Sequence, residues 1–184
     1  YREFLKSDFK IKDGEKVAEC GKPEEIKIEN MTFTYPGNDK PTLKNINLTI
    51  KPYEKIALVG YNGAGKTTLT NLILRLYDVS GGSISIGGED IRNVTADSHR
   101  DRFSAVFQDF QLFACSAGEN VALDASFDED KVKTALQHSG FDKELKKGVF
   151  TELLREFDDE GKMLSGGESQ KIAIARAFYK NCPY

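Results

Sequence analysis

Hydrophobic and polar residues follow two patterns in the first half of this chain. Around residues 26–28, 46–50 and 83–86 apolar side chains alternate with polar ones, and this period of two predicts half-exposed antiparallel strands. Residues 56–59, Ile-Ala-Leu-Val, form a continuous apolar run, which is typical of a strand buried on both faces in a parallel sheet. Residues 103–107 are predicted to form a further short strand. We therefore expect a parallel sheet with residues 56–59 at its centre, and separate antiparallel strands.

Helical spacing of apolar residues follows these segments. After residue 65 apolar residues recur at i, i+3, i+4 and i+7, which predicts a helix that runs to about Tyr77. A second helix is predicted to begin at Ser165, since apolar residues 172, 175 and 179 have the i, i+3, i+7 spacing. Between about residues 109 and 163 the pattern is mainly helical, which favours a helical subdomain.

The composition argues against several classes of protein. With 184 residues, of which 39% are hydrophobic and 30% charged, the chain suits one globular domain, with at most a subdomain. Its longest apolar runs have four residues, as in residues 56–59, whereas a membrane span needs about 20. A net charge of −3 gives no basic surface for nucleic acid or anionic lipid. Three cysteines without a C-x-x-C pair argue against a disulfide framework or a zinc site, and suit a reducing compartment.

Residues 60–67 carry the first candidate chemistry. They fit the phosphate-binding pattern G-x-x-x-x-G-K-[ST] between a predicted strand and a predicted helix. The glycines let backbone N–H groups converge on an anion, and the start of the helix adds its positive dipole end. Lys66 supplies a charge for the β- and γ-phosphates, the Thr67 hydroxyl suits Mg²⁺, and the Thr68 hydroxyl is expected within reach of the phosphates. The residues predicted to bind nucleotide here are Gly60, Tyr61, Asn62, Gly63, Ala64, Gly65, Lys66, Thr67 and Thr68.

A second candidate anion site opens the last predicted helix. It consists of Leu164, Ser165, Gly166, Gly167 and Glu168, which place a hydroxyl and two unhindered backbone amides at a helix start. This segment resembles the L-S-G-G-Q signature of ATP-binding cassette (ABC) proteins, with a glutamate as the fifth residue.

Two further residues resemble functional positions of the same family. Gln108, 42 residues after Lys66, is similar to the Q-loop glutamine, which reaches Mg²⁺ and the attacking water in this family. Tyr35, 25 residues before Gly60, is similar to the aromatic residue that stacks on adenine.

The resemblance covers nearly all of the chain from Ile26 onward and is closest to exporter-type ABC transporters. It implies an α/β fold with a P-loop NTPase core and parallel sheet, an antiparallel β subdomain and an α-helical signature subdomain. It also implies ATP and Mg²⁺ as cofactors, catalytic roles for Lys66 and Gln108, and metal binding by Thr67 and Gln108.

The resemblance implies partners as well. In this family two nucleotide-binding domains, identical or different, pair head to tail and hold each ATP between the P-loop of one and the signature of the other. The dimer drives export through the coupling helices of a transmembrane domain. We therefore expect the chain at the cytoplasmic face of the cell membrane, without nucleic acid as a partner.

The resemblance also sets the expected domain limits. Residues 1–25 are interpreted as a linker from an upstream membrane domain, and residues 26–184 as the nucleotide-binding domain, with the helical subdomain at about 109–163. The family's Walker B strand, catalytic glutamate and switch histidine lie beyond Tyr184, so this chain alone is expected to be inactive in hydrolysis. His99 and His138 are expected to be surface residues.

Two other functions remain open. One is a soluble ABC ATPase that acts on nucleic acid or ribosomes, and the other is a catalytically silent nucleotide-binding module. Repair-type ABC proteins separate the Q-loop from the signature by very long coiled coils, whereas only 55 residues lie between Gln108 and Leu164. This spacing and the net charge of −3 disfavour a nucleic-acid partner.

Overall fold

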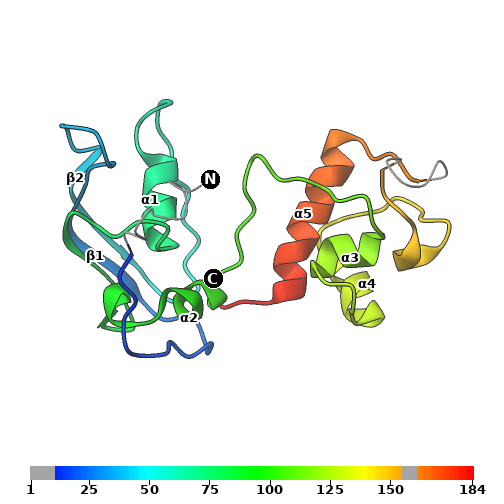
Figure 1. Cartoon of the computed structure of the whole chain (residues 1–184), viewed down its shortest axis with the longest axis horizontal. Helices are drawn as coiled ribbons and strands as arrows, with labels where there is room; N and C mark the ends of the chain where they lie inside the picture. Colours follow the sequence, from blue (N-terminus) through cyan, green and yellow to red (C-terminus); the bar gives the residue numbers. More distant parts are fainter. Residues whose placement is uncertain (1–10, 155–160) are drawn as a thin grey trace, which may run out of the picture. The chain divides into compact units, whose positions relative to one another are not determined.

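The computed structural model describes residues 11–154 and 161–184, which form two compact units (Figure 1). The first unit consists of the chain up to Phe103 together with the last two residues, Pro183 and Tyr184. The second unit is Ser104–Cys182. The first ten residues of the expected linker lie outside the described part. No helix within that part is long and apolar enough to cross a membrane.

An antiparallel sheet forms the first unit, with strands in the order β2-β1-β3-β4. The strands are β1 Ile26–Phe33, β2 Leu43–Ile50, β3 Gly81–Ile86 and β4 Glu89–Asp90. In register, Ile26 faces Ile50 of β2 on one side and Ile86 of β3 on the other. The predicted antiparallel strands are therefore confirmed. Since side chains alternate between the two faces of a strand, the apolar residues of β1 lie together in one core.

Helix α1, Lys66–Ile73, packs on the core of this sheet through Leu69 and Leu72. The helix ends four residues before the predicted end near Tyr77, because Arg75 takes a positive φ of 51° that no right-handed helix continues. Arg75 is 0% exposed, and its guanidinium donates to the carbonyl oxygens of Ile91 and Val94 at 2.7 and 2.6 Å. It also donates to the carbonyl oxygen of Lys12 at 2.8 Å, so part of the expected linker contacts this unit.

The expectation that His99 is a surface residue is wrong. It lies on α2, Ala96–Asp101, with 0% exposure, and its Nε2 donates to the carbonyl oxygen of Ile73 at 2.8 Å. Its ring also packs against Phe103. The sequence around His99 is polar, but α2 packs this face against the end of α1. His138 is exposed, as predicted.

The parallel-sheet strand expected at residues 56–59 and the short strand expected at residues 103–107 are not present in the described part of the chain. Neither segment is a strand, and the sheet there is entirely antiparallel. The side chains of residues 56–59 are exposed, and Val59 reaches 94%. An apolar run becomes a buried strand only where neighbouring strands form backbone hydrogen bonds with it. No described strand pairs with residues 56–59, so this segment is not part of a sheet.

The second unit is helical, as the pattern predicted. It contains α3 Ala117–Ala122, α4 Glu129–His138 and α5 Gly166–Lys180, with short 3-10 turns at Ile91–Asn93 in the first unit and Gly148–Phe150 in the second. Its core contains Val121, Val132, Leu136, Leu153 and Ile172.

The completely buried Asn120 holds the segment before α3 in place. Its side-chain amide donates to the carbonyl oxygen of Phe113 at 2.9 Å and accepts from the Phe113 N–H at 2.9 Å.

Candidate functional site

The loop of residues 60–65 leads into α1 with the backbone that the phosphate-binding pattern requires. Gly63 and Gly65 have φ values of 82° and 89°, a left-handed conformation that glycine adopts without strain. A Cβ on Gly65 would lie 2.5 Å from Cδ2 of Leu43, so a larger residue there would have to displace that side chain as well as adopt the left-handed conformation. The start of α1 has no side-chain cap, so its first N–H groups are left for a ligand, as at other anion-binding helix starts.

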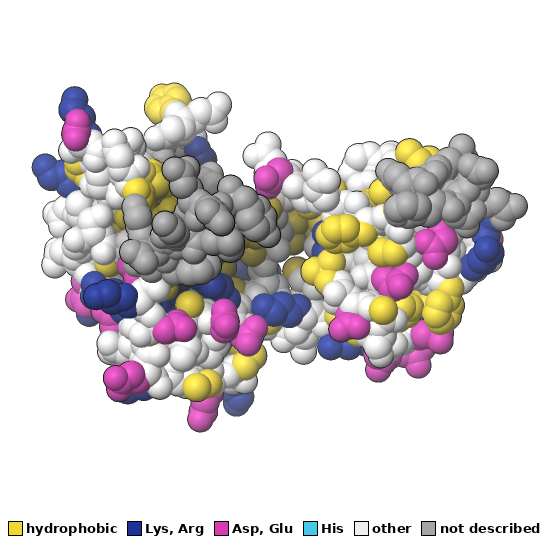
Figure 2. Space-filling view, viewed as in Figure 1, with side chains coloured by type: hydrophobic (Ala, Val, Ile, Leu, Met, Phe, Trp, Pro, Cys, Tyr) yellow, Lys and Arg dark blue, Asp and Glu magenta, His cyan; other side chains and the backbone are white. Residues whose placement is uncertain are grey.

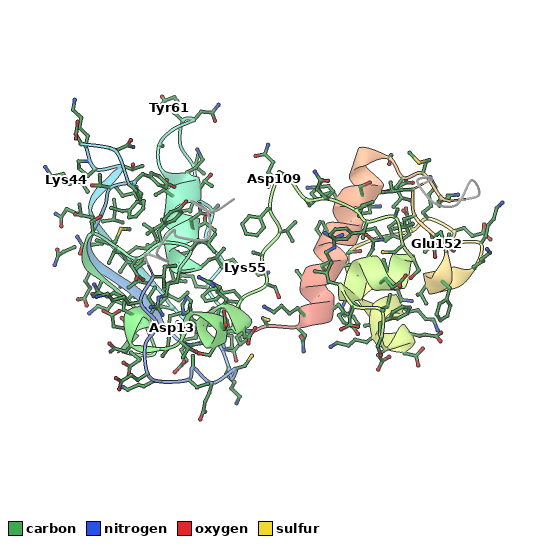
Figure 3. All side chains as sticks on the ribbon, viewed as in Figure 1. Asp13, Lys44, Lys55, Tyr61, Asp109 and Glu152 are labelled. Atoms are coloured by element: carbon green, nitrogen blue, oxygen red, sulfur yellow. The ribbon has the colours of Figure 1, made fainter. Side chains whose placement is uncertain are left out.

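Lys66 lies over this loop. Its ammonium donates to the carbonyl oxygens of Gly60 and Tyr61, at 2.7 and 2.8 Å. The ring of Tyr61 is 91% exposed at the outer end of the loop, where it points away from the unit (Figure 3). These two hydrogen bonds hold the positive charge of Lys66 against the loop.

The two threonines after Lys66 differ in their surroundings. Thr67 is exposed at the first turn of α1, so its hydroxyl is accessible to a metal ion. Thr68 is only 6% exposed, and its hydroxyl is hydrogen-bonded to the Tyr35 hydroxyl at 3.1 Å. Helical periodicity turns consecutive residues about 100° apart, so Thr68 lies on the face of α1 that packs on the core. Its place as a second hydroxyl within reach of phosphate stays a prediction.

Tyr35 is half-buried and belongs to an aromatic cluster. Its ring packs against Phe33 at 4.8 Å and Tyr77 at 5.3 Å between centroids, in edge-on geometry. Pro36 and Gly37 follow in the predicted turn, in which the Asn38 N–H donates to the Tyr35 carbonyl oxygen at 3.1 Å. The hydroxyl contact with Thr68 joins Tyr35 to α1. The residue predicted to bind adenine is therefore held against the helix that follows the phosphate loop.

The second predicted anion site begins α5 with a capping box. The Glu168 N–H donates to Ser165 Oγ at 3.4 Å, and the Ser165 N–H donates to Glu168 Oε2 at 2.7 Å. The side chain of Leu164 packs against the core of the second unit, so it anchors the helix start rather than facing solvent.

Gly166 and Gly167 are exposed in the first turn of α5. Neither has a positive φ, and a Cβ built on either would meet nothing within 4 Å. The fold of this chain therefore does not require glycine at these positions, although glycine in a helix costs up to about 1 kcal/mol relative to alanine. Bare backbone at this surface is what close approach of a ligand or partner requires.

Lys143 is a site residue that the sequence did not indicate. Its ammonium lies 2.7 Å from Oε1 of Glu168, and this contact, with the Ser165 N–H, lowers the pKa of Glu168 to about 2. Lys143 comes 25 residues before Glu168, in a segment without helical or strand periodicity. Only the tertiary structure brings the two together.

Gln108 lies in an exposed turn of the second unit, next to Asp109 (Figure 3). Its side chain makes no hydrogen bond within the described residues, and its contact with Mg²⁺ stays a prediction. Within residues 11–154 and 161–184, no cluster of three His, Cys, Asp or Glu side chains is arranged to hold a metal ion. Binding of Mg²⁺ by Thr67 and Gln108 stays a prediction.

Comparison with known proteins decides the family. A family profile described as ABC transporter matches residues 43–184. The chain belongs to the ABC transporter family. It is 43% identical over 171 residues to the ATP-dependent lipid A-core flippase of Methylobacillus flagellatus, and 35% identical over 185 residues to that of Escherichia coli K12. These alignments cover 90% and 98% of this chain but 29% and 31% of the flippases.

A solved structure of a bacterial Atm1-family ABC exporter with ATP bound matches 99% of this chain and 32% of its own, with a TM-score of 0.84 and 30% identity. The chain thus spans about a third of the length of the ABC proteins that it resembles. The recognition of an exporter-type ABC nucleotide-binding domain and the ABC ATPase fold class are confirmed, with helices and an antiparallel sheet as the described architecture.

Proposed function

We propose that this chain belongs to the ATP-binding and hydrolysing domain of an ABC exporter that uses ATP to move a substrate across a membrane. The observation that supports the proposal is the presence on one ABC chain of two helix starts suited to an anion: the uncapped start of α1 after the phosphate loop, and the start of α5 with its exposed Gly166 and Gly167. The flippases and the exporter that it resembles are named for ATP-dependent transport.

The phosphate loop is the proposed site for the triphosphate of ATP. The backbone N–H groups at the start of α1 and the Lys66 ammonium attract the β- and γ-phosphates, and the exposed Thr67 hydroxyl is available to Mg²⁺. When bound, Mg²⁺ neutralises phosphate charge. Tyr35 is proposed to stack on adenine, and Gln108 to assist at the metal and the attacking water.

The signature start of α5 is proposed to contact an ATP held by a second nucleotide-binding domain. Gly166 and Gly167 have no neighbours that require glycine, and Ser165 faces solvent beside them. A partner that brings a phosphate to this surface explains why the backbone is left bare. We place the resulting head-to-tail dimer at the cytoplasmic face of the membrane, where coupling helices of the transmembrane domain receive the change.

Acidic and basic side chains are interspersed over both units on the face drawn in Figure 2. This face presents no basic stripe of the kind expected on an ATPase that binds nucleic acid, which supports a transporter subunit.

Two variants test the proposal in the full-length subunit. Lys66→Ala removes the loop ammonium and is expected to weaken ATP binding at least about tenfold, since charge-assisted phosphate contacts are among the strong ones. Ser165→Asp keeps a capping side chain at the start of α5 but places a carboxylate where the γ-phosphate would bind. It is expected to leave ATP binding to the phosphate loop intact and to abolish ATPase activity. Calorimetric ATP binding that is equal in Lys66→Ala and wild type would contradict the assignment.

A further inference from the structure

The start of α5 carries an electrostatic conflict. A helix N-terminus attracts an anion such as phosphate, because its free N–H groups and the helix dipole are positive. Glu168 places a carboxylate in the same turn, where its Oε2 accepts the Ser165 N–H at 2.7 Å. The pKa of this carboxyl is lowered to about 2, so it is ionised at neutral pH. An unbalanced charge there would repel a phosphate.

Lys143 offsets that charge. Its ammonium lies 2.7 Å from the other carboxylate oxygen of Glu168, Oε1, and the side chains of the pair are 34% and 18% exposed. Because each carboxylate oxygen has its own partner, Ser165 on one side and Lys143 on the other, the side chain is held in a single position.

The backbone around Lys143 is fixed from both sides. Phe141 and Leu145 pack against the core of the second unit, and the Phe141 N–H donates to the carbonyl oxygen of Leu136 at the end of α4 at 3.0 Å. Phe141, Lys143 and Leu145 are half-buried, whereas the two residues between them are exposed. The packed backbone on both sides of Lys143 therefore fixes the position from which its ammonium reaches α5.

A neighbouring ion pair provides a natural comparison. Asp142 Oδ1 lies 3.1 Å from Nζ of Lys171, three residues after Glu168 on α5. This pair also joins the segment to α5, but it makes no contact with Ser165, and Asp142 is 85% exposed. The two pairs attach the same segment to the same helix, and only the Lys143 pair reaches the capping box.

We propose that Lys143 is a positioning residue of the signature site, whose ammonium neutralises Glu168 so that the start of α5 remains attractive to the terminal phosphate of an ATP on a partner subunit. The inference rests on the proposed function, since it needs a phosphate to arrive at Ser165. On this account Lys143 and Glu168 act together. Glu168 caps the start of α5, and Lys143 compensates the negative charge that Glu168 alone would place there.

The test measures steady-state ATPase activity of the full-length subunit against ATP concentration. Lys143→Met is expected to raise the ATP concentration for half-maximal activity roughly three- to tenfold, the effect of one charge near a helix terminus. Lys143→Arg keeps the charge and is expected to stay close to wild type. Lys171→Met breaks the neighbouring pair and is expected to leave the ATP dependence unchanged.

The double variant Lys143→Met/Glu168→Gln decides between charge compensation and simple tethering. Glutamine retains the oxygen that accepts the Ser165 N–H but carries no charge, so the double variant is expected to recover most of the lost ATP affinity. If Lys143 acts only as a tether, the double variant recovers nothing, because methionine cannot bond to glutamine, and the proposal is overturned. Lys143→Met with wild-type ATP dependence would also overturn it.

Failure of the proposed function would look different. If Ser165→Asp hydrolyses ATP as wild type does, no phosphate reaches this surface, and both proposals fall. If Ser165→Asp is inactive while Lys143→Met is unchanged, the signature site stands and only the role of Lys143 is wrong.

Discussion

Single residues in this chain have roles that follow from their contacts rather than from their residue type. Tyr35 is an example, because its ring and its hydroxyl have separate tasks. The hydroxyl is bonded to Thr68 of α1, whereas the ring packs on Phe33 and Tyr77 and is proposed to stack on adenine.

A pair of substitutions separates these tasks. Tyr35→Phe removes the hydroxyl and is expected to lower the free energy of unfolding by about 0.5–1.5 kcal/mol, with ATP affinity kept. Tyr35→Ala also removes the ring and is expected to weaken ATP binding by about 1–3 kcal/mol. Denaturant unfolding and calorimetry measure the two effects. Equal ATP affinity in Tyr35→Ala and wild type would show that Tyr35 does not stack on the base.

His99 makes the stability of the first unit depend on pH. Burial lowers its pKa, and the neighbouring guanidinium groups of Arg102, Arg75 and Arg100 lower it further. Its Nε2 bonds to a carbonyl oxygen, which accepts only, so the neutral ring carries its proton there. Nδ1 is buried without a hydrogen-bond partner within the described residues.

The sign of the effect follows from this lowered pKa. In the unfolded chain His99 takes up a proton near pH 6.5, whereas the folded chain resists it to lower pH. Stability is therefore expected to fall as the pH drops below about 6.5, by at most about 1.4 kcal/mol per pH unit, until the folded pKa is passed. Thermal unfolding between pH 7.5 and 5 measures this slope. His99→Gln keeps a donor near Ile73 and is expected to reduce the slope; an unchanged slope would rule His99 out as its source.

Among the elements, α5 shows most clearly how stability and function compete. Ser165 and Glu168 cap the helix, yet two glycines occupy its first turn, where an added Cβ would meet nothing within 4 Å. Gly166→Ala is expected to raise the free energy of unfolding by up to about 1 kcal/mol, because alanine has the higher helix propensity. The same methyl group is expected to obstruct the approaching phosphate and to reduce ATPase activity of the full-length subunit.

Thermal unfolding and ATPase activity of Gly166→Ala are therefore expected to change in opposite directions. A variant that is both more stable and fully active would show that nothing approaches this turn closely. Gly14 serves as a contrast within the chain: a Cβ there would lie 2.2 Å from the carbonyl carbon of Asn93, so its replacement is expected to destabilise the first unit.

The success of sequence-based prediction also differed between elements. The strands β1, β2 and β3, the start of α1 and the start of α5 were predicted because period and capping residues are local signals. The end of α1 was not predicted, because Arg75, just beyond it, donates hydrogen bonds to Ile91 and Val94, which are distant in the sequence. The partnership of Lys143 with Glu168 was missed for the same reason, since tertiary packing alone creates it.

At the scale of the whole molecule, residues 56–59 were the largest miss. Their composition is that of a buried parallel strand, but a strand is defined by its neighbours, and the described residues supply none. The motif that follows is nevertheless formed: the turn at Gly63 and Gly65 and the start of α1 depend on local backbone conformation and on packing of Leu69 and Leu72. The phosphate loop was therefore predictable where its preceding strand was not.

The central claim is that the phosphate loop and the signature of one chain serve two different ATP sites. Two differently tagged copies of the full-length subunit test it, one with Lys66→Ala and the other with Ser165→Asp, purified together through both tags. The measurement is retention of a non-hydrolysable ATP analogue after free nucleotide is removed. Either variant paired with itself has no intact site between copies and is expected to lose the analogue, because nucleotide bound to a phosphate loop alone dissociates once free nucleotide is removed.

If each site combines the loop of one copy with the signature of the other, the mixed pair keeps one intact site and retains the analogue. In the control, a copy with both substitutions is paired with wild type, and this leaves no intact site. The opposite result, retention by the control pair and none by the mixed pair, would mean that each chain builds its ATP site alone and would contradict the head-to-tail dimer.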